Sequence, residues 1–232
     1  WLLILDADAQ LQIDVLQRVI PYILQNRCSA LQLRKAVINT KQNFLTRFQS
    51  MEMAMDAVIQ QGRLKGGGIV ELRGNGQFLK RSVIDEIGGF NEETVTDDLD
   101  LSFRLLLEGA MVEILWDPPV EEEAVETIAA LWKQRQRWAE GGLQRFFDYW
   151  NLLFSKLNII QTSDLLCFFS LQYVLPVVSF VDLLIAIFTM SSPIYWPLSM
   201  VAFSVSGVAY WKGCRPSSEG PSIPKRKTIN IF

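Results

Sequence analysis

Residues 1–9, WLLILDADA, join a five-residue apolar run to two aspartates that are separated by one alanine. A run of this kind predicts a strand that is buried on both faces of a parallel sheet. Such a strand needs neighbours, so we expect the sequence to begin inside a fold, as an N-terminally truncated domain. Asp6 and Asp8 would stand at the carboxyl end of this strand, where open α/β sheets bind their ligands.

Helical and strand patterns alternate through the next 130 residues. Apolar positions at steps of three or four predict helices over 12–24 and 44–60, with the stripe Phe44, Phe48, Met51, Met55 and Ile59 as core. Shorter helices are expected over 80–88 and 96–109, and strands over 32–39, 69–72 and 111–119. The alternation predicts an α/β domain over residues 1–142 with a largely parallel sheet.

The composition limits which catalytic groups and binding partners the chain can have. The chain has no histidine, so carboxylates must carry any acid–base work. Its net charge of −3 and the lack of a basic stripe argue against a nucleic-acid partner. Cys28, Cys167 and Cys214 fit neither zinc spacing nor a disulfide framework.

The C-terminal part is typical of a membrane protein. Residues 143–163 combine aromatic, apolar and basic side chains, as an amphipathic helix in the membrane interface does, although a core helix has the same composition. Apolar stretches over 165–190 and 193–211 predict a transmembrane hairpin within residues 164–211, in which Asp182 would face another helix or the far headgroups. The basic tail, 212–232, then predicts a multi-pass protein with its catalytic domain on the cytoplasmic side.

Three polar clusters are candidates for a site, and each has an ordinary structural alternative. Asp6 and Asp8 can hold a divalent ion with a nucleotide diphosphate, or form a solvated acidic loop. The cluster Thr96–Asp100 can cap a helix and supply a carboxylate base. In QRQRW, residues 134–138, helical spacing puts an amide, a guanidinium and an indole on one face, which suits diphosphate and sugar binding or simple packing.

Taken in order, DAD, GNGQF, TDD and QRQRW resemble the D-x-D, T-[DE]-D and Q-x-x-R-W motifs of inverting, membrane-anchored family 2 glycosyltransferases. The resemblance implies a GT-A type nucleotide-sugar domain that uses a UDP-sugar donor and Mg²⁺ or Mn²⁺. It implies that Asp8 binds the metal and Asp6 the nucleotide. Asp98 would be the general base, with Asp97 and Asp100 in support.

The same resemblance assigns the remaining candidates. Gln134, Arg137 and Trp138 would hold the diphosphate and border the acceptor site. The stretch from Gly74 through Asn75, Gly76 and Gln77 to Phe78 would form the acceptor-side loop. Arg137 and the metal would stabilise the leaving diphosphate, and a base on the opposite face would produce inversion.

Within the family, residues 74–101 and 121–150 are most similar to the cyanobacterial monoglucosyldiacylglycerol synthases. That similarity implies transfer of glucose from UDP-glucose to the free hydroxyl of diacylglycerol, giving a β-glycoside. Membrane lipids would be further binding partners. A processive β-polysaccharide synthase of the cellulose or hyaluronan type, with a growing glycan as acceptor, is the alternative enzyme. A non-catalytic membrane scaffold is the alternative outside enzymes.

Overall fold

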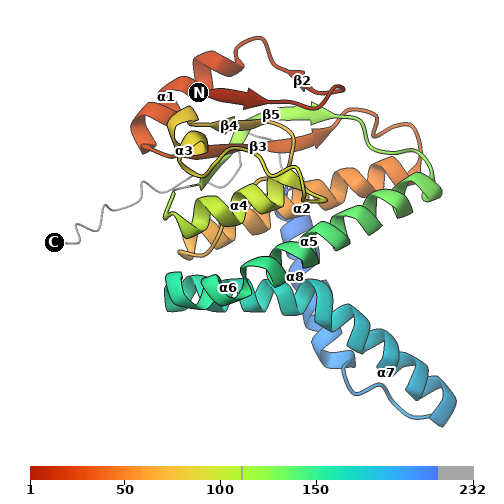
Figure 1. The fold of residues 1–232 in the computed structure, drawn as a ribbon. Coiled ribbons are helices and arrows are strands. Elements are labelled where there is room, and N and C mark those ends of the chain that lie inside the picture. Colours follow the sequence, from red (N-terminus) through yellow and green to blue (C-terminus); the bar gives the residue numbers. More distant parts are fainter. Residues whose placement is uncertain (111, 214–232) are drawn as a thin grey trace.

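A five-stranded sheet lies above two layers of helices in the computed structural model of the chain, which describes residues 1–110 and 112–213 (Figure 1). The strands are β1 (Leu2–Ile4), β2 (Gln10–Leu11), β3 (Ala30–Val37), β4 (Gln77–Leu79) and β5 (Val112–Glu122). The helices are α1 (Val15–Asn26), α2 (Phe44–Lys65), α3 (Arg81–Glu86), α4 (Asp97–Leu107), α5 (Ile128–Lys156), α6 (Ile159–Phe169), α7 (Leu175–Thr189) and α8 (Trp196–Gly213). A π-helical segment, η1 (Ser170–Val174), joins α6 to α7.

The sheet is mixed, so the expectation of a largely parallel sheet is wrong while the α/β class is confirmed. Its order is β1-β4-β3-β5-β2, and of the pairings in the described chain only β3 with β5 is parallel. Gly74 and Gly76, at φ +79° and +73°, turn the chain so that β4 runs back between β1 and β3. Residues 69–72, expected as a strand, are buried but join no strand ladder.

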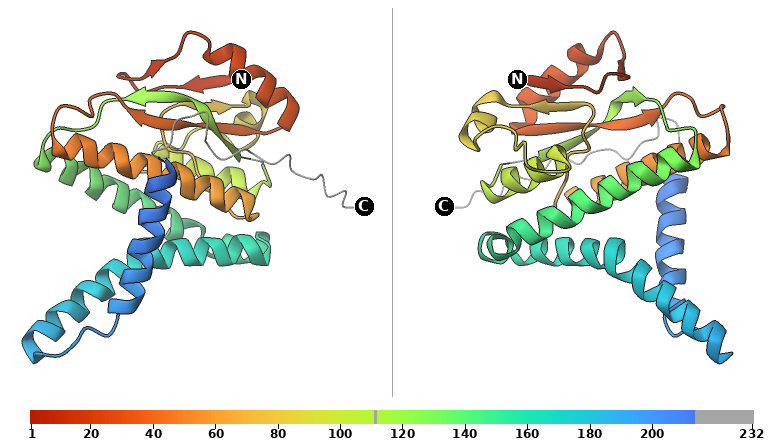
Figure 2. Two further views of the ribbon diagram at one scale, coloured as in Figure 1. Left: turned by 180° about the vertical axis from the view of Figure 1, so that it is seen from behind. Right: turned by 45° about the vertical axis from the view of Figure 1, so that its right-hand side comes forward.

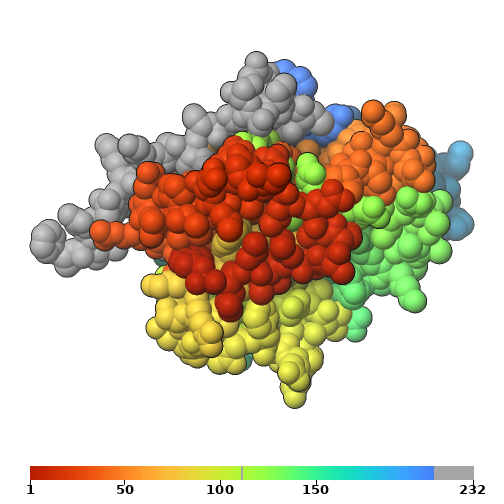
Figure 3. Space-filling model, turned by 90° about the horizontal axis from the view of Figure 1, so that it is seen from above, coloured from red at the N-terminus to blue at the C-terminus, as the bar shows by residue number. Residues whose placement is uncertain are grey.

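β1 is an edge strand here, contrary to the expectation that it is buried on both faces. It pairs with β4 alone, and its side chains are half-buried. Seen from above, the N-terminal residues (red) lie uppermost, with α2 and α5 at their side (Figure 3). β3, β4 and β5, which lie between the edge strands β1 and β2, supply the strand residues of the core.

Both faces of the sheet are covered by helices (Figure 2). On one face α1 buries Val15, Val19 and Ile23 against side chains of β3, β4 and β5. On the other, α2 and α4 pack beneath the strands, with Leu101 and Leu105 of α4 in one buried cluster. The carboxyl ends of β1, β3 and β5 therefore point to a common edge above α2, α4 and α5.

The apolar stripe of α2 was predicted to be core, and this prediction is wrong. Phe44 and Phe48 are 81% and 50% exposed, and the buried face is largely polar. Irregular backbone lies under that face and needs hydrogen-bond partners. Gln60 accepts from the backbone N–H of Glu71 at 3.2 Å, and Gln49 donates to the carbonyl of Val125 at 2.7 Å.

α5 runs without a break through Gly141 and Gly142, where the sequence suggested a change of element. The two glycines serve close packing, because a side chain at Gly141 would overlap Thr96 and one at Gly142 would overlap the hydroxyl of Tyr173. Beyond them α5 has two faces. Phe146 is buried with residues of α4 and α6, whereas Phe147 is 75% exposed. The core interpretation of this segment describes the buried face, and the interfacial interpretation of the exposed face stays a prediction.

The continuous helical stretch Ile159–Thr189 is, within the described residues, the one stretch long and apolar enough to cross a membrane. It begins six residues before the expected first span, and it bends at η1 and Pro176 (Figure 1). The expected second span is helical as α8 but does not meet the same criterion. Asp182 is nearly buried and accepts from the backbone N–H of Tyr195, which fixes the turn between α7 and α8. The basic tail from residue 214 onward, with Cys214, lies outside the described residues.

Candidate active site

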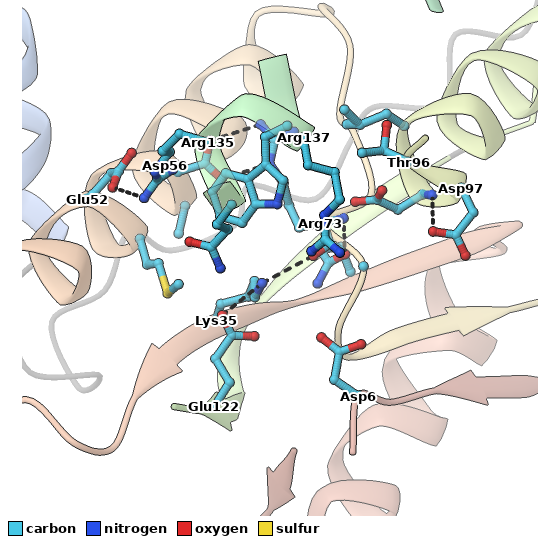
Figure 4. Close-up of a pocket in the computed structure, with 18 of the residues that line it drawn as sticks. Asp6, Lys35, Glu52, Asp56, Arg73, Thr96, Asp97, Glu122, Arg135 and Arg137 are labelled. Atoms are coloured by element: carbon cyan, nitrogen blue, oxygen red, sulfur yellow. Dashed lines mark hydrogen bonds and ion pairs between the residues drawn. The ribbon is translucent and has the colours of Figure 1, made fainter. Parts of the chain in front are cut away.

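A cavity of about 500 Å³ opens where the carboxyl ends of the strands meet α2, α4, α5 and η1. It gathers eight of the expected site residues, namely Asp6, Asp8, Gly74, Asp97, Asp98, Gln134, Arg137 and Trp138. Figure 4 shows Asp6 and Glu122 on one side, Arg135 and Arg137 on the opposite side, and Lys35 and Arg73 between them. Asp6 and Trp138, which are 132 positions apart in the sequence, thus line the same cavity.

The loop before β4 supports the aspartates from below. The amide oxygen of Asn75 accepts from the backbone N–H of Asp6 at 3.2 Å, and its amide nitrogen donates to Glu122 at 3.0 Å. A side chain at Gly76 would overlap Val120. Of the five expected loop residues, only Gly74 lines the cavity, while Asn75, Gly76, Gln77 and Phe78 are buried.

Asp6 and Asp8 are exposed at the sheet edge, and Asp8 accepts from the backbone N–H of Glu123 at 3.2 Å. No group of three or more acidic or cysteine side chains in the described residues is placed to hold a metal by itself. Mg²⁺ commonly takes only one or two carboxylates and completes its shell with water and substrate phosphates. Two exposed carboxylates beside an open cavity fit that mode of binding.

Asp98 stands in the first turn of α4, half-buried at the cavity wall. Burial raises the pKa of its carboxyl group, the neighbouring Asp97 adds to the rise, and Arg73 and Lys35 oppose it. Asp97 is exposed and accepts from the backbone N–H of Asp98 at 3.0 Å. A carboxylate with a raised pKa is a stronger base than an ordinary aspartate.

Asp100 does not reach the cavity. It is 3% exposed, and its carboxylate pairs with Arg104 at 2.7 Å and accepts from the hydroxyl of Tyr149 at 2.6 Å. Because Tyr149 belongs to α5, these contacts join α4 to α5. Asp100 therefore supports the helix that carries Asp98, rather than the cavity surface itself.

The QRQRW segment contains a second arginine at the cavity, Arg135, that the sequence analysis did not single out. The guanidinium of Arg135 lies over the ring of Trp138 at 4.3 Å and pairs with Glu52 of α2 at 2.6 Å. Arg137 lines the cavity, is exposed and makes no ion pair with another described residue. Arg135 thus fixes the indole, and Arg137 is left available for a ligand.

Under the cavity floor lies a buried cluster that sequence reasoning missed. Glu71 is fully buried and approaches Arg73 at 2.9 Å, Arg145 at 3.1 Å and Arg63 at 3.7 Å. Burial alone would raise the pKa of Glu71, but these guanidinium groups hold it at about 2. A charged residue inside the apolar run IVEL was the available signal, since a buried charge requires partners.

The apolar helical stretch is attached to this cluster and reaches the cavity. Asp164 of α6 pairs with Arg63 at 3.0 Å and accepts from the backbone N–H of Ile69 at 2.9 Å. Further along, Phe168, Gln172 and Tyr173 line the cavity together with Asp98 and Trp138. The polar site is therefore continuous with the helix that could cross a membrane.

Comparison with known proteins finds similar glycosyltransferases. The chain is 49% identical to a β-monoglucosyldiacylglycerol synthase from Synechocystis sp. over 94% of its length, and 46% identical to that of Trichormus variabilis over 91%. It spans about half the length of these curated relatives, 46% in each case. A solved mannosyltransferase from Pyrobaculum calidifontis, in complex with GDP-Man and Mn²⁺, matches at a TM-score of 0.48 and 15% identity over 92% of this chain and 62% of its own.

The family model described as glycosyl transferase family group 2 matches residues 1–210, which include every cavity-lining residue named above. The match covers both the α/β part and the helices that follow it. The expected family resemblance is confirmed, and with it the coarse expectation of a glycosyltransferase domain of the α/β class, although its sheet is mixed. The chain belongs to glycosyl transferase family group 2.

Proposed function

We propose that the protein transfers glucose from UDP-glucose to the free hydroxyl of diacylglycerol, with inversion, at a membrane surface. The observation that carries the proposal is one cavity that joins exposed carboxylates, an aspartate with a raised pKa, an arginine that no described residue pairs with, and the apolar helical stretch. Relatives named for this lipid product support the choice of acceptor over a growing polysaccharide.

The donor would lie along the sheet edge. Asp6 and Asp8 face the diphosphate side, and Asp8 is the proposed metal ligand. Mg²⁺ or Mn²⁺, when bound, neutralises charge on the leaving diphosphate. Arg137 and Gln134 approach from α5, where a guanidinium can bind two phosphate oxygens at once.

Asp98 would act from the other wall of the cavity. Its carboxylate takes the proton of the acceptor hydroxyl as that oxygen bonds to the anomeric carbon. The bond from the anomeric carbon to the diphosphate oxygen breaks, and UDP leaves with the electron pair. Attack from the face opposite the leaving group converts an α-linked donor into a β-glycoside.

The membrane arrangement belongs to the same proposal. The stretch Ile159–Thr189 would enter the bilayer, α8 would return as the second half of a hairpin, and the exposed face of α5 would lie at the interface. The cavity, which Phe168 and Tyr173 line, would then stand directly over the lipid surface. By the positive-inside rule the catalytic part would be cytoplasmic.

The test uses the full-length protein in vesicles that contain diacylglycerol, with labelled UDP-glucose. We expect a single-sugar glucolipid whose anomeric configuration, read by NMR, is β. A long polymer would instead indicate a processive synthase, and an α-glucolipid would exclude the inverting mechanism.

A further inference from the structure

The helical stretch Ile159–Thr189 changes from α to π geometry at η1, Ser170–Val174. Single π turns inside α-helices are rare and occur frequently at functional sites. This one coincides with the side of the helix that meets the catalytic cavity, because Phe168, Gln172 and Tyr173 line it.

The other side of η1 has a different character. Leu171 and Val174 are 48% and 45% exposed, and they border a shallow apolar groove that extends to α8. The segment therefore offers side chains to the reaction site on one side and apolar surface on the other. A lipid that follows the helix can keep its chains on apolar surface while its polar end enters the cavity.

Gln172 is the polar side chain of η1 on the side that faces the cavity. It makes no hydrogen bond to another residue in the described parts of the chain, 1–110 and 112–213, and its side chain is exposed into the cavity. An amide offers two donors and one acceptor, and no described residue occupies them. The side chain is therefore available to a polar group of a ligand in the cavity.

We propose that Gln172 is a specificity-determining residue that donates to an ester carbonyl of the diacylglycerol acceptor, with Phe168 against the first acyl carbons. This inference rests on the proposed function. An uncharged amide suits an uncharged ester, whereas a phosphate-bearing lipid is matched better by guanidinium or ammonium groups. The nearby guanidinium of Arg145 is already engaged by Glu71 at 3.1 Å.

The experiment compares two acceptors that differ only at the proposed contact, a diacylglycerol and the dialkylglycerol ether of equal chain length. Full-length protein is assayed in vesicles of each with UDP-glucose. We expect the wild type to favour the diester in kcat/KM by about 5- to 10-fold, the scale of one neutral hydrogen bond. The Gln172→Leu variant should use both acceptors equally, with an unchanged KM for UDP-glucose.

A composition-matched variant controls for the helix itself. Leu171→Gln combined with Gln172→Leu keeps the amide in the segment but moves it to the groove side, so it should behave as Gln172→Leu does. Gln172→Asn, which retains an amide, should recover part of the preference for the diester.

Several outcomes overturn the inference, and they differ from a failure of the proposed function. A wild type that uses both acceptors equally, or a Gln172→Leu variant that keeps the diester preference, rejects the role of Gln172 while leaving lipid transfer in place. An equal loss on both acceptors means that Gln172 is merely structural. A wild type that glucosylates neither lipid rejects the proposed function, and the inference with it.

Discussion

The acidic side chains around the cavity form two sets that differ in whether a cation holds them. Below the floor, Glu71 and Asp164 are paired with arginines. Three acids of the cavity wall are also paired with Arg or Lys side chains, namely Glu52, Asp56 and Glu122. At the cavity surface, Asp6, Asp8 and Asp98 make no ion pair with another described residue. Burying a carboxylate is costly without a partner, whereas an exposed one remains free to bind a ligand. Pairing therefore separates acids that hold the fold from acids available for chemistry.

Removing the proposed base should have the largest effect. Asp98→Asn keeps the shape of the side chain but cannot take a proton, so transfer should fall by about 10²- to 10⁴-fold, the usual worth of general base catalysis. Product formation from labelled UDP-glucose in vesicles measures the loss, and donor binding should persist. The surface variant Asp85→Asn, whose parent side chain is 69% exposed, serves as the control. Near-normal transfer by Asp98→Asn would place the base elsewhere.

Removing the carboxylate of Glu71 should instead destabilise the fold. Glu71→Gln leaves three guanidinium groups without their shared carboxylate, and loss of one partner from a buried ion pair typically costs about 3–5 kcal/mol. Thermal unfolding of the full-length protein in detergent, followed by tryptophan fluorescence, measures the change. The exposed pair of Glu108 with Lys156 at 3.4 Å gives a matched control, since Glu108→Gln should cost only about 0–1 kcal/mol. Equal losses in the two variants would reject the distinction between the sets.

Asp8→Ala should affect ligand binding without affecting the fold. If Asp8 is a metal ligand, metal-dependent binding of UDP should weaken by at least about 10-fold, because even the partners of metal ligands contribute that much. Calorimetric titration of UDP with and without Mg²⁺ separates the metal-dependent part. Thermal stability should match the wild type, since Asp8 is exposed. UDP affinity that is unchanged in the presence of Mg²⁺ would argue against the assignment.

Lowering the pH should affect transfer before it affects stability, and this is the smallest of the expected effects. The pKa of Asp98 is raised, so transfer should decline as the pH falls through a value above that of an ordinary aspartate. The pKa of Glu71 lies below its ordinary value, so its contribution to stability is complete above that value and is lost as the pH falls toward about 2. Profiles of kcat/KM and of melting temperature against pH should therefore show reversible inactivation while the fold persists. Coincident profiles would contradict this.

The location of the site could be predicted from the sequence because strand ends meet at one sheet edge. Asp6, Asp98 and Arg137 all reach the cavity as their motifs imply. Which strands run parallel and which antiparallel could not be predicted. The turn at Gly74 and Gly76 depends on backbone conformation that no apolar pattern encodes.

Which charged side chains form ion pairs could not be predicted from the sequence either. QRQRW offers two arginines, and only the approach of Glu52 from α2 decides that Arg135 holds Trp138 and leaves Arg137 available. The stripe of α2 misled for a similar reason. Its polar face is buried because irregular backbone lies against it, and the periodicity of one helix carries no information about its neighbours.

The ion pair between Asp164 and Arg63 joins the first turns of the apolar stretch to α2, while α5 arrives at the same place as one unbroken rod. No flexible tether stands between Trp138 and Lys156. If the stretch spans a bilayer as proposed, tilting the helix would tilt the cavity with it. Bilayer thickness and curvature, which set helix tilt, would then alter the rate of transfer without contacting any reacting group.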